Sequence, residues 1–370
     1  MNGTVLMLMI EPTPYILGFI REMKSHWTGK VEVAFVGRNL SQTWDECFIE
    51  EKVLPVGFFR AALDLWACLK RNHYSLVHLA GWSHPLIFAA LLICAVRGIP
   101  TTIESDTPHR TESAGWRPWA KRILYPWLFR LPRLFLPGGS RQAAYLRKYG
   151  VPEERIRIAH MTVDIVTIQD NLVDLSSGQR SCTRKRMGFS DFQTVFLYVG
   201  RLEHYKGILD LLAAYRDLKN RSNAVGCVLL IVGDGTCRVE VDEAVKLLPG
   251  MVATGRLTGS DLFNAYIAAD VLVLPSITEN WGLVVNEAMA FGLPVIATDA
   301  VGCVDDLVKP GVTGLIVPAG NSAALAEAMQ RLASDSELRR AFGAAARERI
   351  QPWTLKYEAE CVSRAWQEAL

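Results

Sequence analysis

The stretch SITENWGLVVNEAMAFGLPVIATD, residues 276–299, decides how the second half of this chain folds. It continues the apolar run VLVLPS (271–276), which is typical of a buried strand. Its LVVNEAMAF segment predicts a short helix that ends at Gly292 and Pro294. A strand, a loop and a helix in this order form the unit at which open α/β sheets bind ligands. We therefore expect a binding site in the loop.

Two acids lie in this stretch, Glu279 in the predicted loop and Glu287 on the predicted helix. The N–H groups of the first helical turn, from Gly282 to Val284, favour an anion, and Gly282 has no side chain to keep a phosphate away. Because carboxylates repel phosphate, we interpret both acids as acceptors for neutral hydroxyls on either side of it. A nucleotide sugar has this layout. The alternative is two ordinary surface acids, and their spacing alone does not exclude it.

A second feature favours the nucleotide sugar. In TVFLYVGRLEHYKGILDLLAAY (194–215), a predicted strand ends at Gly200, and Arg201 and Lys206 follow it before an amphipathic helix. Cations at the carboxyl end of a strand can neutralise a diphosphate and stabilise it as a leaving group. Isolated loop cations are usually solvated surface charges. Their combination with the two acids indicates a diphosphate site.

The composition indicates a globular α/β protein. The chain has 370 residues, 50% of them hydrophobic and 21% charged, and strand-like runs alternate with helical ones along it. Two sheets of about five strands each suit this length better than one large sheet. A net charge of +2 argues against a nucleic-acid partner, and eight cysteines without a C-x-x-C pair suggest neither a zinc cluster nor a disulfide framework. We expect a cytoplasmic protein.

The domain boundaries follow from breaks in the apolar periodicity. We predict a first domain over residues 1–165, an interdomain linker over 166–189, a second, nucleotide-sugar-binding domain over 190–350 and a C-terminal helix over 351–370. The cationic run Arg184–Arg186 is interpreted as part of the solvated linker or as a helix start.

The motifs resemble a known family. GRLEHYKG, IVGDGT, ATGRLTGSDL, LPSITENWGLVVNEAMAFGLPVIATD and GVTGLIVP follow one another as in the retaining glycosyltransferases of family 4. The resemblance is strong over residues 190–350 and weaker over 1–160, and the E-x(7)-E element of Glu279 and Glu287 is its most specific part. It implies the GT-B fold, two Rossmann-like domains with a cleft between them and a C-terminal helix that crosses back to the first domain. It also implies that the N-terminal domain, residues 1–165, binds the acceptor.

The resemblance also implies roles for individual residues. Arg201 and Lys206 would grip the donor diphosphate, Glu287 would accept hydrogen bonds from the ribose, and Glu279 would touch the donor sugar. Further donor-binding positions lie in four turns. They are Gly200, then Gly233 and Asp234, then Gly255, Arg256 and Leu257 beside the nucleobase, and finally Asn280, Trp281, Gly282, Leu283 and Val284.

The first half departs from the family pattern in two places. The loop after the first strand usually holds a Gly-Gly pair, but here EPTPYILGF contains Gly18 alone. The frequent active-site histidine is replaced by Asp106, and His109 follows three residues later. Either Asp106 or His109 is a candidate for contact with the transferred sugar.

Residues 115–133, GWRPWAKRILYPWLFRLPR, interleave aromatic side chains with Lys and Arg. This composition suits the surface of an anionic membrane, and family members that extend lipid-linked oligosaccharides fit the same interpretation. A core helix with snorkelling cations is the alternative. Base stacking on RNA is disfavoured by the balanced charge.

The sequence thus predicts a metal-independent retaining hexosyltransferase. It would move a hexose from a nucleoside diphosphate sugar to a hydroxyl of a glycan or polyprenyl-linked acceptor, in bacterial cell-surface polysaccharide assembly, at the inner face of the cytoplasmic membrane. The chain has no D-x-D motif, so Arg201 and Lys206 would supply the positive charge, and neither a metal nor a cofactor is expected. The alternatives are a GT-B nucleotide-sugar epimerase and a catalytically degenerate binding subunit.

Overall fold

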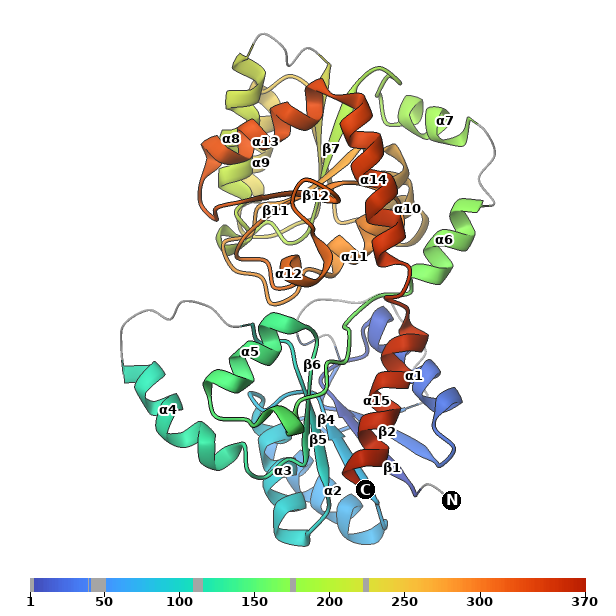
Figure 1. Ribbon diagram of the computed structural model, residues 1–370, viewed down its shortest axis with the longest axis vertical. Helices are drawn as coiled ribbons and strands as arrows, with labels where there is room; N and C mark the ends of the chain where they lie inside the picture. The colour runs from blue at the N-terminus through green and yellow to red at the C-terminus, as the bar shows by residue number, and fades with distance from the viewer. Residues whose placement is uncertain (1–2, 39, 41–50, 109–115, 174–177, 222–225) are drawn as a thin grey trace. The chain divides into compact units, whose positions relative to one another are not determined.

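A computed structural model describes residues 3–38, 40, 51–108, 116–173, 178–221 and 226–370. The chain divides into two compact units, which are coloured along the chain in Figure 1. Unit 1 comprises Met1–Asp164 and Trp353–Leu370, and unit 2 comprises Ile165–Pro352. Each unit contains a six-stranded parallel sheet flanked by helices. The predicted α/β class with two Rossmann-like domains is confirmed.

Unit 1 is built on a sheet with the order β3-β2-β1-β4-β5-β6. Its strands are β1 (Val5–Met9), β2 (Val31–Phe35), β3 (Lys52–Val53), β4 (Leu76–Leu79), β5 (Thr101–Ser105) and β6 (Leu134–Pro137). Its helices are α1 (Pro14–His26), α2 (Phe58–Arg71), α3 (Pro85–Arg97), α4 (Trp116–Leu128), α5 (Ser140–Lys148) and α15 (Leu355–Ala369), with a 3-10 turn at Glu153–Arg155. Helices α1 and α15 cover one face of the sheet, and α2, α3 and α5 cover the other.

The central strand β1 is apolar throughout because both of its faces are buried. Val5, Met7 and Met9 point into the core under α1 and α15, whereas Leu6 and Leu8 point into the core under α2 and α3. A strand that is buried on both faces needs a continuous run of apolar residues. A strand with one exposed face would instead alternate apolar and polar residues.

The C-terminal helix α15 belongs to unit 1. Its Trp366 is fully buried and packs edge-on against Trp27, with ring centroids 5.4 Å apart. The Trp366 indole N–H donates to Nδ1 of the buried His78 on β4 over 3.2 Å. A tryptophan that is buried and also hydrogen-bonded fixes the helix on the sheet.

Unit 2 has the strand order β12-β11-β10-β7-β8-β9. Its strands are β7 (Thr194–Val199), β8 (Cys227–Val232), β9 (Met251–Gly255), β10 (Val271–Leu274), β11 (Val295–Thr298) and β12 (Gly314–Val317). Its helices are α6 (Ile165–Val173), α7 (Gln179–Arg186), α8 (Ile208–Asn220), α9 (Arg238–Leu247), α10 (Gly259–Ala268), α11 (Leu283–Ala290), α12 (Val304–Leu307), α13 (Ser322–Ser334) and α14 (Ser336–Ile350), with a 3-10 turn at His204–Lys206.

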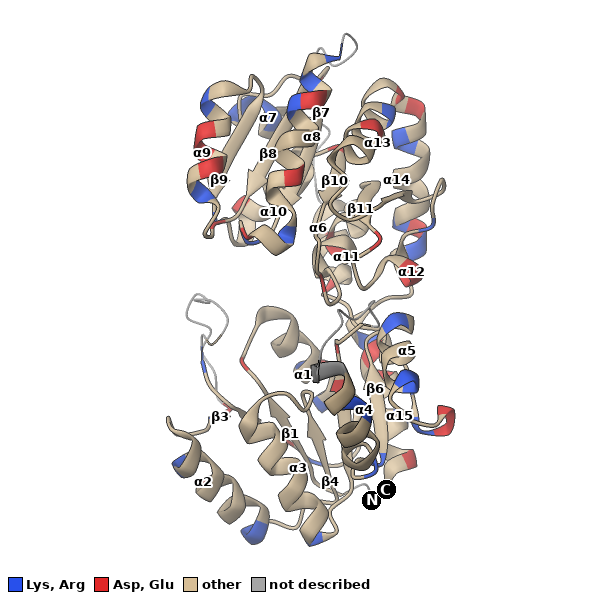
Figure 2. Ribbon diagram, turned by 90° about the vertical axis from the view of Figure 1, so that its left-hand side faces the viewer, with Lys and Arg blue, Asp and Glu red and all other residues tan. Residues whose placement is uncertain are grey.

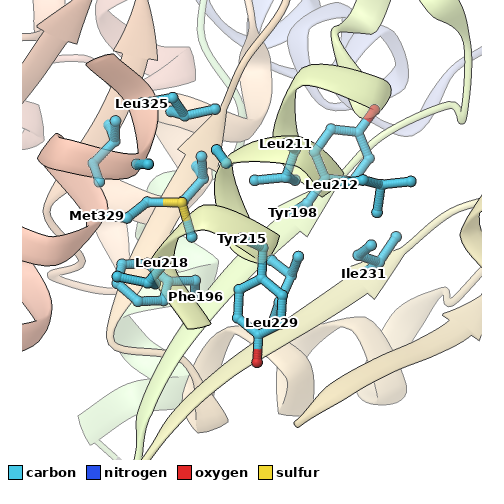
Figure 3. Packing of buried hydrophobic residues seen from close by; sticks show 14 of the residues in the cluster. Phe196, Tyr198, Leu211, Leu212, Tyr215, Leu218, Leu229, Ile231, Leu325 and Met329 are labelled. Atoms are coloured by element: carbon cyan, nitrogen blue, oxygen red, sulfur yellow. The ribbon is translucent and has the colours of Figure 1, made fainter. Parts of the chain in front are cut away.

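A close-packed core joins β7 and β8 to α8 and α13. Figure 3 shows Phe196 and Tyr198 of β7 beside Tyr215 of α8 and Met329 of α13. These side chains are fully buried, and the Tyr215 hydroxyl donates to the Cys227 carbonyl over 3.0 Å. This core fixes the position of β7, and it therefore also fixes where the loop after β7 begins.

Two strands were not expected from the sequence. Strand β3 has two residues and β12 has four, and both lie at sheet edges. Short edge strands carry little apolar periodicity, so the expectation of about five strands in each sheet was one too low.

The linker predicted over residues 166–189 is wrong for most of its length. Helices α6 and α7 form there and belong to unit 2. Arg184, expected to be solvated, is 3% exposed and is ion-paired with Asp270, while Lys185 and Arg186 are exposed. The buried ion pair between Arg184 and Asp270 attaches α7 to unit 2.

Candidate active site

The candidate site of unit 2 lies where the strand order reverses. Strand β7 lies between β8 and β10, and the chain continues from β7 to one edge of the sheet and from β10 to the other. Loops at such a switch point diverge and leave a crevice beyond the carboxyl ends of the strands. Lys206 follows β7 and Glu279 follows β10, so the predicted cation and the first predicted acid lie on its two sides.

The two loops are joined through their backbones. The carbonyl of Tyr205 accepts hydrogen bonds from the N–H groups of Ile277 and Thr278, over 2.9 and 3.0 Å. Gly207 has a φ of +68°, and a Cβ there would lie 1.9 Å from the carbonyl oxygen of Pro275. Glycine is therefore required for the loops to approach so closely.

Lys206 and Glu279 form an ion pair in this crevice. The side chains are 15% and 14% exposed, and Ser276 Oγ lies 3.5 Å from the same Glu279 oxygen. The ammonium has three donors, so Lys206 can hold Glu279 and still donate to a bound anion. The structure thus brings together two residues that are 73 positions apart in the sequence.

Arg201 completes the cationic side of the crevice. Its guanidinium carbon lies 5.5 Å from the centre of the Tyr205 ring, and the Lys206 ammonium lies 5.6 Å from the same ring. The pKa of Tyr205 is raised by burial, lowered by Arg201 and raised by Glu279. Arg201 and Glu279 thus act on one phenol, and Lys206 lies over the same ring, so the three charges lie close together, and the exposed Arg201 can reach a ligand.

Glu287 lies on α11 and is held by a residue that the sequence did not single out. The Tyr266 hydroxyl of α10 donates to its carboxylate. Burial raises the pKa of Glu287, and the hydrogen bond from Tyr266 opposes that shift. Tyr266 is itself 2% exposed and stacks on Phe291, with ring centroids 4.8 Å apart. A phenol locked in this way fixes the orientation of the carboxylate.

The turn into α11 differs in detail from the expectation. Gly282 has a φ of +100°, and a Cβ there would lie 3.0 Å from Val301 and 3.1 Å from Leu274. Glycine is required here by this left-handed conformation and by close packing against Val301 and Leu274. Trp281 is 3% exposed and donates to Asn286 over 3.0 Å. Its indole therefore braces the loop, and its backbone is the part that remains a candidate for ligand contact.

The other predicted donor-binding turns lie beside these loops. The N–H of Gly233 donates to the carbonyl of Gly255 over 2.8 Å, and that of Gly200 donates to Val232 over 3.0 Å. Leu202 N–H donates to the carbonyl of Asp234 over 2.9 Å. The carboxyl ends of β7, β8 and β9 are thus linked in series, and the chain continues from Gly255 to the exposed Arg256 and to Leu257. Asn280 is exposed, and Leu283 and Val284 are half-buried.

Unit 1 holds the remaining candidates. Asp106 is exposed directly after β5, and it acts with Glu104 to raise the pKa of Tyr15, which is already raised by burial. His109 lies outside the described residues. Instead of a Gly-Gly pair, the loop after β1 carries Glu11, which is 7% exposed and accepts a hydrogen bond from the backbone of Leu40 over 2.8 Å.

A cavity in unit 1 is lined by Tyr15 and by Ser105, which directly precedes Asp106, and it was not predicted from the sequence. It has a volume of about 30 Å³, room for one or two water molecules. Its polar lining is Tyr15, Glu104, Ser105, Thr162 and Glu358. The buried Ser105 hydroxyl has no hydrogen-bond partner among the described residues. Burial, with the nearby Glu104 charge, raises the pKa of Glu358 well above its usual value.

Glu358 predicts a pH-dependent stability of unit 1. The pKa of Glu358 is higher in the folded protein than in the unfolded chain, where it lies near 4.5. Its contribution to the free energy of unfolding is therefore fully present below pH 4.5 and is lost as the pH rises through the pKa of the folded state. Glu358→Gln mimics the neutral acid. We expect its melting temperature to exceed that of the wild type by about 2–4 °C at pH 8.5 and to match it near pH 4.5.

Thermal unfolding between pH 4.5 and 8.5 tests this prediction. Glu360→Gln is the matched control, since this acid lies two positions further along α15 and its side chain is 43% exposed. A difference between Glu358→Gln and the wild type that stayed constant across the pH range would contradict the assignment.

Glu358 and Tyr266 were not predicted from the sequence, but a signal in the sequence existed for one of them. Leu355, Ala359, Val362 and Trp366 form an apolar helical stripe, and Glu358 lies within it, so an acid on a buried helix face was visible in the sequence. Tyr266 carried no such signal, because its partner Glu287 is 21 residues away on another helix.

Within the described ranges, no cluster of three or more His, Cys, Asp or Glu side chains is arranged to hold a metal ion. Among the same residues, every helix is too short or too polar to span a membrane.

Comparison with known proteins identifies the family. Residues 180–349 match the family described as glycosyl transferases group 1, and residues 47–166 match glycosyltransferase family 4. D-inositol 3-phosphate glycosyltransferase of Rhodococcus opacus is 28% identical over 81% of this chain and 67% of its own length. Alpha-D-kanosaminyltransferase of Streptomyces kanamyceticus is 31% identical over 52% of this chain and 49% of its own length. The chain thus spans about two thirds of one relative and about half of the other.

Solved structures show the same fold over the whole chain. Anabaena HepE in complex with UDP superposes with a TM-score of 0.79 at 18% identity, and the match covers all of both chains. Sucrose-phosphate synthase from Thermosynechococcus elongatus superposes with a TM-score of 0.76 at 20% identity over 99% of both chains. The two family matches and this shared architecture identify the chain as a family 4-like glycosyltransferase with the GT-B fold.

Proposed function

We propose that this protein is a metal-independent retaining hexosyltransferase that uses a nucleoside diphosphate sugar. The observation that carries the proposal is the Lys206–Glu279 pair at the switch point of the unit 2 sheet, with Arg201 beside it. The cations suit a diphosphate, and the acids Glu279 and Glu287 suit the hydroxyls on either side of it. HepE structures that hold UDP or UDP-glucose share this fold, which supports a donor of that class.

The proposed chemistry needs no protein nucleophile. The bond between the sugar's anomeric carbon and the diphosphate oxygen breaks, and a bond from the acceptor oxygen forms on the same face. The leaving diphosphate oxygen takes the acceptor's proton. Arg201 and Lys206 stabilise the negative charge that develops on that oxygen, the role a metal ion fills in other transferases. Glu279, already ion-paired with Lys206, is placed to orient the donor sugar.

Tyr266 gives this proposal a specific test. In Tyr266→Phe, Glu287 loses the hydrogen bond that lowers its pKa, so the carboxylate protonates at higher pH. A hydrogen bond to a charged group contributes about 1.5–3 kcal/mol, so we expect the donor KM to rise by about tenfold or more. The acid limb of the kcat/KM profile should also move to higher pH. Steady-state kinetics between pH 5 and 8 measure both effects.

Tyr215→Phe is the matched control for this variant. Its hydroxyl is also buried and bonds the carbonyls of Cys227 and Pro249, inside the core and away from the candidate site. It should lower stability and leave the donor KM unchanged. Equal KM effects from the two variants would count against a role of Glu287 in donor binding.

The proposed acceptor is a hydroxyl of a glycan or a polyprenyl-linked sugar in cell-surface polysaccharide assembly, at the cytoplasmic face of the membrane. Helix α4 supports the membrane location. Trp119 and Trp127 are 66% and 67% exposed, while Tyr125 and Phe129 pack into the core of unit 1. Arg130 lies 4.5 Å above the Trp127 ring. Residue 115 and the side chains of 116–118 lie outside the described residues.

A release assay tests the function. Purified protein is incubated with UDP-, GDP- and ADP-sugars in the presence of a chelator, with and without crude lipid-linked oligosaccharide. Release of nucleoside diphosphate from one donor, dependent on acceptor, supports transfer and identifies base and sugar together. Conversion of the donor sugar without acceptor would indicate an epimerase. Binding of a donor without consumption would indicate a binding subunit. That alternative is motivated by the segment after β1, which holds Gly18 in place of a Gly-Gly pair, and by Asp106 at the position of the family's frequent histidine.

A further inference from the structure

The outer sides of α2 and α3 in unit 1 expose large apolar side chains. Their exposed fractions run from 39% to 82%, and they recur every three or four residues along each helix. They are Phe59, Leu63 and Trp66 on α2, and Phe88, Leu92 and Val96 on α3. Residues spaced by three or four lie on one side of a helix, so each helix presents one apolar stripe.

The two stripes face the same way. Ala61, Leu65 and Leu69 of α2 and Leu91 and Cys94 of α3 are buried in one core cluster beneath the helices, so the exposed stripes of both helices point away from that cluster. Helices α2 and α3 pack directly against each other, as Figure 2 shows. The stripes therefore form one apolar surface, which we call the α2–α3 face. Soluble monomers rarely expose so many large apolar side chains together.

The charge on the α2–α3 face has one sign. Helix α3 contains no acid, and the single acid of α2, Asp64, is ion-paired with Lys52 over 2.5 Å. Exposed cations lie on both helices, which carry blue segments in Figure 2. They are Arg60, Lys70, Arg71 and Arg97.

We propose that the α2–α3 face is a membrane-docking surface that lies on an anionic bilayer. Phe, Trp and Leu enter the boundary between headgroups and acyl chains, and Lys and Arg meet lipid phosphates. The face is formed by residues other than those of α4, and its membrane affinity is independent of the transfer reaction. It extends the proposed membrane contact from one helix to a broad surface of unit 1.

A second copy of the chain fits this face less well. A two-fold dimer places the same patch of each copy against the other. The cations Arg60, Lys70, Arg71 and Arg97 of both copies would then gather at one interface without an unpaired acid of either helix to neutralise them. An anionic bilayer supplies the missing negative charge.

Vesicle co-sedimentation of the full chain tests the proposal, with phosphatidylcholine vesicles that contain either 30% or no phosphatidylglycerol. The wild type should bind the anionic vesicles, and binding should weaken in 0.5 M salt. The double variant Phe59→Ser with Leu63→Ser should bind about tenfold more weakly or worse, because two inserted apolar side chains are lost. Leu92→Ser with Val96→Ser provides an independent variant on α3 with the same expected loss.

Phe192→Ser is the matched control, since Phe192 is 99% exposed in unit 2 and should leave vesicle binding unchanged. Thermal unfolding shows that each variant is folded. Vesicle binding at the wild-type level by both folded double variants would overturn the proposal and leave α4 as the contact. A concentration-dependent dimer that both variants abolish, without vesicle binding by the wild type, would overturn it in favour of a self-interface. Neither result would alter the donor-release assay.

Discussion

Lys206→Ala is expected to lower kcat/KM for the nucleotide-sugar donor by about two to three orders of magnitude. The Lys206 ammonium is the most enclosed cation of the candidate site, 15% exposed and paired with Glu279. In an environment with little water, a charge on the leaving diphosphate depends strongly on such a donor. Its removal also leaves the Glu279 carboxylate unpaired beside the place where negative charge develops. Both effects raise the barrier to transfer, and initial rates with a saturating acceptor measure their sum.

Two further variants separate the role of Lys206 in catalysis from its role in holding Glu279. Lys246→Ala removes an equal charge from the exposed end of α9 in the same unit and should leave kcat/KM unchanged. Glu279→Gln keeps Lys206 but removes the ion pair, so a diphosphate contact by Lys206 predicts a smaller loss than in Lys206→Ala. If Glu279→Gln proved as damaging as Lys206→Ala, the misplaced acid would explain the loss in Lys206→Ala, and a diphosphate contact by Lys206 would not be needed. Near wild-type activity of Lys206→Ala would refute the proposed site.

The parts of the site that follow a buried strand could be predicted from the sequence. Lys206 and Glu279 each come after an apolar run, and parallel strands bring their carboxyl ends to one edge of a sheet. The strand order, which makes β7 and β10 neighbours, was not visible in the sequence. It explains why these two side chains meet.

Other features depend on tertiary contacts that leave no local pattern. Tyr266 matters because α10 lies beside α11, and the left-handed turn at Gly282 is shaped by Val301 and Leu274. The aromatic residues of α4 looked alike in the sequence, but packing divides them between the core and the surface. Burial, which the sequence does not fix residue by residue, decides the role of each.

Arg184 shows this dependence most clearly, and it carries the largest stability prediction. Its guanidinium is 3% exposed, donates to the carbonyl of Ala268 over 2.9 Å and pairs with Asp270. Asp270 also accepts from Arg180 and from the backbone N–H of Val195, over 2.6 and 2.8 Å. This network ties α7 to the end of α10 and to the start of β7. Arg184→Ala leaves Asp270 paired with Arg180, whose side chain is 50% exposed, and removes the buried guanidinium, a loss that costs up to about 3–5 kcal/mol.

Arg184→Ala should therefore lower the melting temperature of unit 2 by about 10 °C, as measured by calorimetry or circular dichroism at pH 7. Arg186→Ala is the control, because Arg186 lies on the same helix two residues later and is exposed, so its loss should change the unfolding free energy by less than about 0.5 kcal/mol. Similar effects of the two substitutions would mean that residues 179–186 behave as the solvated linker predicted from the sequence. A large effect of Arg184→Ala alone would mean that unit 2 begins before residue 190. The reason is that Arg184, a residue of α7, would then be needed for the stability of that unit.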